Sequence, residues 1–411
     1  MRTRFTWILA VLALVSIGVV MACSTKYSSS SNGLVIVPTQ GGAVMETFSL
    51  DLSSGRASQI NNVNGPPING VPTSLILDPA GAFAYLIIYQ NPAVAGSATG
   101  IETFQVASDG KLTPIGTTPL TNPVALTIDS AGKFLFVANG SEGTVSVFSI
   151  GSNASLSEVT NSPFLLQFPL GGQNPNASAL AVTPTVFPIS FAACSGQTVP
   201  TTENLYVADS VNYALLNYSV DLSTGALTLT RYSTPLPGIP TGTTPSGVAV
   251  DPCNRFVYVA NAGPGSNGNS VSAYSICSTV NLNSQPPCQS PDYSLHPITG
   301  SPFAVSPGDG PGPMAVDPYG NYLYVVDTGS SQVSGYRISP TNGSLTAIPG
   351  TPVATNAGPN SIAIRSDDTW LFVANFTSAT LSQYAITPAS GTLTSQPPIT
   401  TLNQPTGVAV K

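Results

Sequence analysis

One pattern of residues recurs along the 411-residue chain and constrains its fold more than any other feature. Each copy has a proline, a short apolar segment ending near an aspartate, an aromatic-rich segment ending in Ala-Asn or Ala-Asp, a third segment with one aromatic at a fixed place, and a fourth after Gly-x-Leu. The clearest copy runs from Pro123 to Phe164. Alternating apolar and polar residues with turn residues between them predict short antiparallel strands. Seven copies are marked by the third-segment aromatics Phe48, Phe104, Phe148, Tyr218, Tyr274, Tyr336 and Tyr384.

Four strands per copy, repeated, predict an all-β, seven-bladed β-propeller with four antiparallel strands per blade. No stretch shows a 3.6-residue apolar period, so we expect almost no helix. Residues 33–38 (Gly-Leu-Val-Ile-Val-Pro) match a second strand with no first strand before it, and residues 405–410 (Pro-Thr-Gly-Val-Ala-Val) match a first strand with none after it. The two terminal strands are therefore predicted to share one blade, which closes the array and removes exposed edges. The propeller domain is predicted to span residues 33–411.

The segment before the propeller predicts export. Arg2 and Arg4 precede an apolar run over residues 7–22 that is shorter than a membrane-spanning helix, so residues 1–22 are predicted to be a signal peptide. Val20-Met21-Ala22-Cys23 resembles the lipobox of bacterial lipoproteins, and this resemblance implies that Cys23 is acylated and holds the protein on a membrane. The alternative is an ordinary signal peptide with a cysteine at that place by chance. Residues 23–32 are then a lipidated, Ser-rich tether, and the location is the bacterial cell envelope, at the outer membrane or in the periplasm.

Charge excludes some partners. Only 7% of the residues are charged and the formal net charge is −7, so the chain lacks the basic surface of a nucleic-acid binder. The few Lys and Arg residues also leave little to hold a heavily phosphorylated substrate.

Four further cysteines in an exported chain predict two disulfides. Their places in the repeat favour Cys194–Cys253 and Cys277–Cys288, and the pairing Cys253–Cys277 stays open.

The repeat also resembles a known family. Units such as Pro-x-x-x-Ala-Val-Asp-Pro (residues 245–252) followed by Tyr-Val-Ala-Asn (residues 258–261) and Val-Ser-x-Tyr-x-Ile (residues 271–276) resemble the YVTN-type repeats of lactonase-like seven-bladed propellers. That group is similar to 6-phosphogluconolactonase-type and muconate-cycloisomerase-type enzymes, and the resemblance covers residues 33–411. Members that resemble the enzymes use His, Arg and Glu side chains on one face. Here His296, the one histidine, follows a fourth-strand leucine on the outermost strand, and Arg255, Arg337 and Arg365 fall in turns or outer positions, so these roles are not transferred.

Candidate site residues stand where second strands end. We predict that these side chains form a polar ring at the mouth of the channel that binds a ligand; the alternative is that each makes an Asx turn into the third strand. The ring consists of Asn139, Asp209, Asn261, Asp327 and Asn375. Glu46 and Glu102 share a third-strand register in neighbouring blades; a carboxylate pair can act as general acid and base, but adjacent blades are expected to keep these two apart. No phosphate loop, nucleophile elbow or metal motif is present, and no cofactor is implied.

Two functions follow. The first is a monomeric, lipid-anchored binding or scaffold protein for a protein or glycan partner at the envelope, because the chain has no complete catalytic set. The alternative is a lactone hydrolase that acts on an uncharged lactone, with water activated by Asp209 or Asp327.

Overall fold

The computed structural model describes residues 32–60, 65–167, 173–184, 202–230, 238–265, 267–277, 292–305 and 310–411. The predicted signal peptide, the tether with Cys23, and the cysteines Cys194 and Cys288 lie outside these residues. Within them the chain forms strands and turns and no helix, and hence no helix that is long and apolar enough to cross a membrane. Acylation of Cys23 and the disulfide pairing therefore stay predictions.

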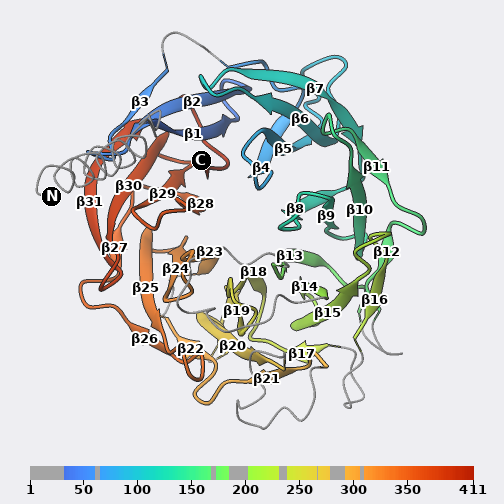
Figure 1. Cartoon of the computed structure of the whole chain (residues 1–411), viewed down its shortest axis with the longest axis vertical. Coiled ribbons are helices and arrows are strands. Elements are labelled where there is room, and N and C mark those ends of the chain that lie inside the picture. Colours follow the sequence, from blue (N-terminus) through green and yellow to red (C-terminus); the bar gives the residue numbers. More distant parts are fainter. Residues whose placement is uncertain are drawn as a thin grey trace, which may run out of the picture.

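Seven sheets stand around a central channel as the blades of a propeller (Figure 1). In each blade the strands follow one another from the channel outward. Blade 1 contains β32 (Ala409–Val410), β1 (Asn32–Thr39), β2 (Val44–Asp51) and β3 (Ala57–Gln59). Blade 2 contains β4 (Val71–Leu77), β5 (Phe83–Tyr89), β6 (Gly100–Val106) and β7 (Leu112–Pro119). Blade 3 contains β8 (Pro123–Ile128), β9 (Phe134–Asn139), β10 (Thr144–Ile150), β11 (Leu156–Glu158) and β12 (Phe164–Leu165).

The remaining blades repeat this order. Blade 4 contains β13 (Ala177–Val182), β14 (Glu203–Asp209), β15 (Ala214–Val220), β16 (Leu227–Leu229) and β17 (Ile239–Pro240). Blade 5 contains β18 (Pro245–Val250), β19 (Phe256–Asn261), β20 (Ser270–Ile276), β21 (Leu295–Pro297) and β22 (Phe303–Ala304). Blade 6 contains β23 (Pro311–Val316), β24 (Tyr322–Asp327), β25 (Gln332–Ile338), β26 (Leu345–Ala347) and β27 (Val353–Ala354). Blade 7 contains β28 (Pro359–Ile364), β29 (Trp370–Asn375), β30 (Thr380–Thr387) and β31 (Thr392–Thr400).

The ring closes within blade 1, as the sequence predicts. Strand β32 pairs antiparallel with β1, with Val410 opposite Val35. Two backbone hydrogen bonds join Leu34 and Lys411, at 3.1 Å and 2.8 Å. The first and last described strands therefore complete one four-stranded sheet, and the predicted seven-bladed fold is confirmed.

The outermost strand of blades 3 to 6 differs from the single fourth strand expected from the sequence. It is broken into two short pieces, which pair with opposite ends of the third strand: β11 and β12 both pair with β10, for example. At the break in blade 3, the Ser162 hydroxyl accepts the backbone N–H of Val147 at 2.9 Å, and Ser301 does the same for Ala273 in blade 5. A side chain thus replaces the backbone partner that the break removes.

Four glycines that lie just before a fourth strand lock neighbouring blades together. Each has a positive φ, which glycine adopts without strain, and each lies against a second-strand aromatic ring of the preceding blade. The pairs are Gly55 with Trp370, Gly225 with Phe134, Gly343 with Phe256, and Gly391 with Tyr322. Two neighbouring tyrosines add hydrogen bonds, Tyr258 to the carbonyl of Gly343 at 3.0 Å and Tyr324 to that of Gly391 at 2.8 Å.

We expect Gly343→Ala to destabilise the protein by about 2 kcal/mol or more, because alanine is strained at positive φ and its methyl group must displace the Phe256 ring. A Cβ at Gly343 would lie 2.5 Å from Phe256 Cδ1. Gly350→Ala is the matched control: Gly350 also has a positive φ of 87°, but its nearest neighbour is 4.0 Å away. Thermal and urea unfolding measure both variants, and equal losses of stability would contradict the role of the ring contact.

Candidate functional site

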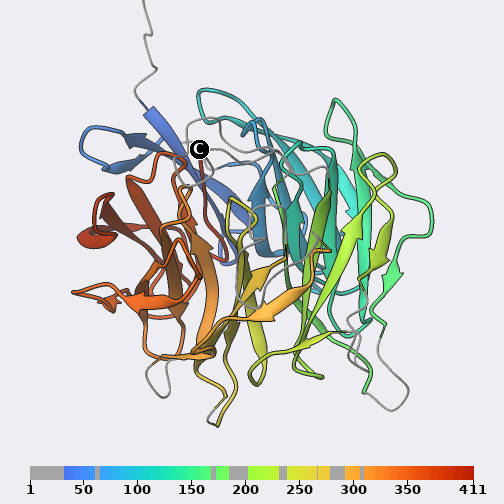
Figure 2. The same cartoon turned by 60° about the horizontal axis from the view of Figure 1, so that its bottom comes forward.

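The propeller has two faces, one on each side of the ring of blades (Figure 2). We call the face with the turns between first and second strands, and between third and fourth strands, the turn face. The opposite face carries the turns between second and third strands and the blade-to-blade connections, and we call it the crossover face. All Lys and Arg residues of the described part of the chain lie at or beside the turn face: Arg56, Lys111, Lys133, Arg255, Arg337, Arg365 and Lys411. The crossover face therefore has no described cation.

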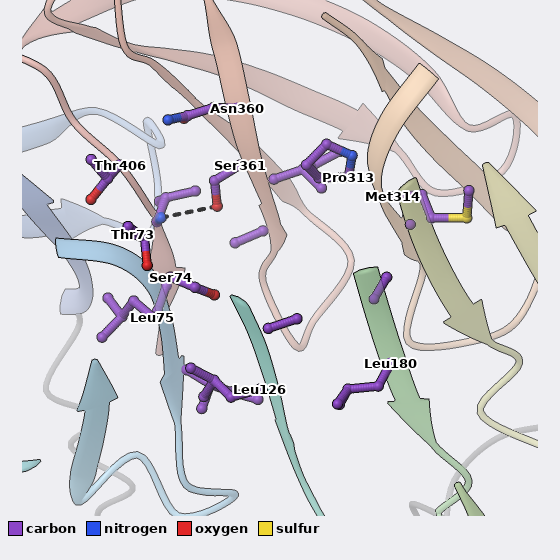
Figure 3. A pocket seen from close by; sticks show the side chains of 18 of the residues that line it. Thr73, Ser74, Leu75, Leu126, Leu180, Pro313, Met314, Asn360, Ser361 and Thr406 are labelled. Atoms are coloured by element: carbon purple, nitrogen blue, oxygen red, sulfur yellow. Dashed lines mark hydrogen bonds between the residues drawn. The ribbon is translucent and has the colours of Figure 1, made fainter. Parts of the chain in front are cut away.

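A cavity of about 640 Å³ runs along the central channel. The innermost strands of all seven blades line it, from β4, β8, β13, β18, β23 and β28 to the residues before and within β32 (Figure 3). Asp78, at the turn-face end, is the one charged residue among the lining residues. A volume of this size is typical of small-molecule sites.

Side chains of equivalent position form layers in this cavity. The residue two before the last one of each innermost strand is apolar in every blade: Leu75, Leu126, Leu180, Val248, Met314, Ile362 and Val408. Nearer the crossover face, the residue two positions earlier is polar in five blades: Thr73, Ser178, Ser246, Asn360 and Thr406. The cavity is thus apolar in its middle and polar toward the crossover face.

Several of these polar side chains connect neighbouring blades. Three donate to the carbonyl of the first residue of the next blade's inner segment: Ser178 Oγ to Pro245 O at 2.7 Å, Ser246 Oγ to Pro311 O at 2.7 Å, and Asn360 Nδ2 to Pro405 O at 3.1 Å. Between blades 2 and 3 the donor is instead the Tyr89 hydroxyl, which lies 2.5 Å from Pro123 O. These contacts use the single donor of the Ser178 and Ser246 hydroxyls, whose lone pairs can still accept hydrogen bonds.

Other polar groups in the cavity keep unused donors. The hydroxyls of Thr73 and Ser74 make no hydrogen bond to another residue that the structure describes. The Ser361 hydroxyl accepts the backbone N–H of Val408 at 3.2 Å (Figure 3), and its own proton has no described acceptor. These three hydroxyls, from blades 2 and 7, are the groups best placed to contact a ligand.

The five predicted ring residues lie elsewhere. They are buried at the ends of β9, β14, β19, β24 and β29, and none lines the cavity. Asn139, Asn261 and Asn375 donate to third-strand hydroxyls of their own blade, Ser334 donates to Asp327 at 2.6 Å, and Asp209 accepts two backbone N–H groups of the following turn. Asp209 thus makes the Asx turn of the alternative. The other four bond third-strand hydroxyls instead, and ligand binding at these residues stays a prediction.

Two of these five residues bind the connection between blades in the same way as the buried Glu46 and Glu102. Asp209 and Asn261 each accept a backbone N–H from the connection that enters their own blade, at Asn176 and Gly242, both at 3.0 Å. Blades 1 and 2 have no Asn or Asp at this strand end. There, Glu46 accepts the N–H of Leu402 at 2.8 Å and Glu102 that of Asn69 at 2.9 Å.

The predicted acid–base pair is thus not assembled at the cavity. Glu46 and Glu102 hold separate connections, and neither lines the cavity. Burial raises the pKa of both carboxyl groups, while the backbone hydrogen bonds oppose the rise.

His296 and the arginines also lie outside the cavity lining. His296 is on the outer strand β21, with Nε2 3.1 Å from the Ser294 hydroxyl, as its place in the repeat predicts. Arg255 forms a buried ion pair with Asp251 and donates to the carbonyl of Gly320 at 3.0 Å. Arg365 pairs with Asp367, and Arg337 lies over the ring of Tyr322. Their contacts are structural, and the described residues contain no cluster of His, Cys, Asp and Glu that could hold a metal.

Three buried carboxyl groups near the turn face have raised pKa values. Burial and the nearby Asp129 carboxylate raise the pKa of Glu203 to about 8, and its two oxygens have no hydrogen-bond partner among the described residues. Burial, opposed by backbone hydrogen bonds, raises the pKa of Asp317 to about 6, and burial together with Asp317 and Asp367 raises that of Asp368 to about 7. Each of these groups binds its proton more tightly in the folded protein than in the unfolded chain, so protonation stabilises the folded state.

The raised pKa of Glu203 predicts a pH-dependent stability. The folded protein keeps a proton at Glu203 that the unfolded chain loses above pH ~4.5, so stability falls as pH rises toward about 8. We expect Glu203→Gln to match the wild type near pH 4 and to exceed it by about 2 to 4 kcal/mol near pH 9. Urea unfolding across this pH range measures the difference. Glu142→Gln, at an exposed turn, is the control, and a stability gain that does not vary with pH would contradict the prediction.

Comparison with known proteins places the fold in a family. Residues 26–179 and 294–410 match the family model described as lactonase, seven-bladed β-propeller. The chain belongs to this lactonase family. Similar solved structures include a candidate 6-phosphogluconolactonase from Bacteroides uniformis (18% identity, 93% of this chain and 100% of that one, TM-score 0.70) and the periplasmic gluconolactonase of Pseudomonas aeruginosa (17% identity, 92% and 98%, TM-score 0.68). At these identities they support the fold, and no curated protein matches the sequence.

Membership of the lactonase family corrects one prediction from the sequence. The binding or scaffold hypothesis rested on the missing catalytic His, Arg and Glu set, and the family match overturns it in favour of the lactone hydrolase alternative.

Sequence reasoning also missed the cavity residues. Thr73, Ser74, Asn360 and Ser361 follow the proline that opens a first strand. Consecutive polar residues in a strand that is otherwise apolar are the signal that points to them, because the innermost strand is the one that faces the channel.

Proposed function

We propose that this lactonase-family member is a lactone hydrolase whose substrate binds in the central cavity. The observation that carries the proposal is family membership together with a channel cavity of about 640 Å³ lined by all seven blades. Gluconolactonase and 6-phosphogluconolactonase, the activities named for the similar structures, both open a lactone ring.

An uncharged lactone suits this cavity best. A phosphorylated or carboxylated substrate needs cations, and phosphate sites in proteins use Arg, Lys or helix N-termini. No Lys or Arg is among the cavity's lining residues, and those of the described chain lie at the turn face. Burying an unpaired negative charge in such a site is costly.

The reaction proposed is simple hydrolysis. Water adds to the lactone carbonyl carbon, the bond from that carbon to the ring oxygen breaks, and the product is a hydroxy acid that releases one proton at neutral pH. As the carbonyl oxygen gains negative charge, hydrogen-bond donors stabilise it. The free hydroxyls of Thr73, Ser74 and Ser361 supply such donors from this chain. Anchoring through an acylated Cys23 would place the activity at the bacterial cell envelope.

Release of acid tests the proposal directly. We expect the purified protein to open neutral lactones faster than the spontaneous rate in a pH-stat, because the cavity offers hydroxyl donors and its one charged lining residue, Asp78, does not repel an uncharged substrate. A phosphorylated lactone should react much more slowly, since it meets no cation. Heat-denatured protein is the control. A rate equal to the spontaneous rate across the neutral lactones would contradict the proposal.

Activation of water by Asp209 or Asp327 has its own test. Both carboxylates are 0% exposed and bonded within their blade, so we expect Asp209→Asn and Asp327→Asn to lower the melting temperature and to keep most of the turnover of the folded protein. Circular dichroism and the pH-stat measure the two effects separately. A hundredfold loss of turnover in a folded variant would instead place that aspartate in the reaction.

A further inference from the structure

We infer that the substrate is amphipathic: an uncharged lactone ring that carries an apolar chain, rather than a polyhydroxylated sugar lactone. The inference rests on the proposed function and concerns the same cavity. It follows from an uneven distribution of hydrogen-bonding side chains along the cavity, with free hydroxyls toward the crossover face and a ring of apolar side chains in the middle.

One arc of the wall is polar. Blades 7, 1 and 2 are consecutive, and they bring Asn360, Ser361, Thr406, Thr73 and Ser74 to the same side of the cavity (Figure 3). The hydroxyl protons of Thr73, Ser74 and Ser361 have no acceptor among the described residues. A lactone group has two oxygen acceptors and no donor, so it matches an arc that offers hydrogen-bond donors.

The free hydroxyl of Thr73 has a structural cause. In blades 4 and 5 the equivalent Ser178 and Ser246 donate to a proline carbonyl of the next blade. For blade 2 the corresponding carbonyl of the next blade is that of Pro123, and the Tyr89 hydroxyl donates to it. Thr73 is therefore released from the contact between blades and is left facing the cavity.

The middle of the cavity offers almost no side-chain hydrogen bonds. There the wall is the apolar layer, to which Leu75, Leu126, Leu180 and Met314 belong (Figure 3). Nearer the crossover face, Ser178 and Ser246 already donate their hydroxyl protons between blades. A sugar lactone carries hydroxyls around its whole ring, so those that face the apolar layer would lose their hydrogen bonds to water without replacement by a side chain.

An apolar chain resolves this mismatch. With the lactone group at the polar arc, a chain attached to the ring would lie against the apolar layer deeper in the channel. Each buried methylene strengthens binding by about fourfold. The cavity volume of about 640 Å³ holds a lactone ring with a chain of several carbons.

A chain-length series tests the inference. The purified protein is given unsubstituted δ-valerolactone, δ-lactones with alkyl chains of increasing length, and glucono-δ-lactone, and kcat/KM is measured by pH-stat. We expect kcat/KM to rise by about threefold to fourfold per methylene before it levels off, and to be at least tenfold lower for glucono-δ-lactone. Equal or falling values with chain length, or a preference for glucono-δ-lactone, overturn the inference and leave the proposed hydrolase standing.

Variants separate the contribution of the apolar layer to kcat/KM from that of the polar arc. Leu126→Asn and the milder Met314→Gln should flatten the chain-length dependence, whereas Leu165→Asn, at an exposed outer strand, should not change it. Thr73→Val with Ser74→Ala should lower kcat/KM by tenfold or more at every chain length and keep the slope. If kcat/KM depends on chain length as in the wild type in both folded Leu126→Asn and folded Met314→Gln, the alkyl chain does not lie against the apolar layer and the inference is overturned.

The proposed function can fail separately. If no lactone is hydrolysed, ligand-observed NMR with the same alkyl series reports binding alone. Affinity that rises with chain length and is weakened by Met314→Gln would support the amphipathic site without a hydrolase. No binding of the longest lactone, or binding that does not depend on chain length, would overturn the inference as well.

Discussion

The contact between innermost strands is the constraint on which the rest of the propeller depends. These strands do not pair with one another, so side chains and single carbonyls must hold seven sheets at a common radius. Small residues allow the approach: a Cβ at Gly247 would lie 2.4 Å from the carbonyl of Gly312 in the next blade. Hydroxyl-to-carbonyl bonds such as Ser246 to Pro311 then fix the spacing. Proline suits the accepting position because it has no N–H that would need a partner of its own.

The chemistry of the cavity follows from departures from this contact. If every blade donated a hydroxyl to the innermost strand of the next blade, the channel would expose few free hydrogen-bond donors. Tyr89 substitutes for Thr73 in one blade, and Gly312 supplies no side chain in another. The first departure frees a donor, and the second leaves Pro313 and Met314 to form an apolar surface. Repeat proteins can acquire a site in this way, because a residue released from its structural task still stands at a fixed place in a rigid frame.

Much of the fold could be predicted from the sequence, and the site could not. Seven aromatics at one register, and an incomplete blade at each end of the chain, specify the number of blades, the order of their strands and the closure of the ring. They do so because repeat units bury their apolar faces only against each other. The broken outer strands could not be foreseen, since the role of Ser162 depends on a backbone N–H across the sheet. Asn139 and its equivalents were recognised by type and place, but second strands face neighbouring blades and connections rather than the channel. Which hydroxyls stay free depends on partners from other blades, and a single repeat cannot show that.

The pairing of β32 with β1 also sets an order of events during folding. Strand β1 leaves the ribosome long before β32, so blade 1 must wait with Leu34, Val35, Ile36 and Val37 along an unpaired inner edge. Contacts between residues so distant in sequence form slowly. An apolar edge of this kind can recruit a strand from another molecule, and the competition ends only when the last segment of the chain arrives. Aggregation during synthesis, rather than low stability of the finished ring, is therefore the hazard that this architecture carries.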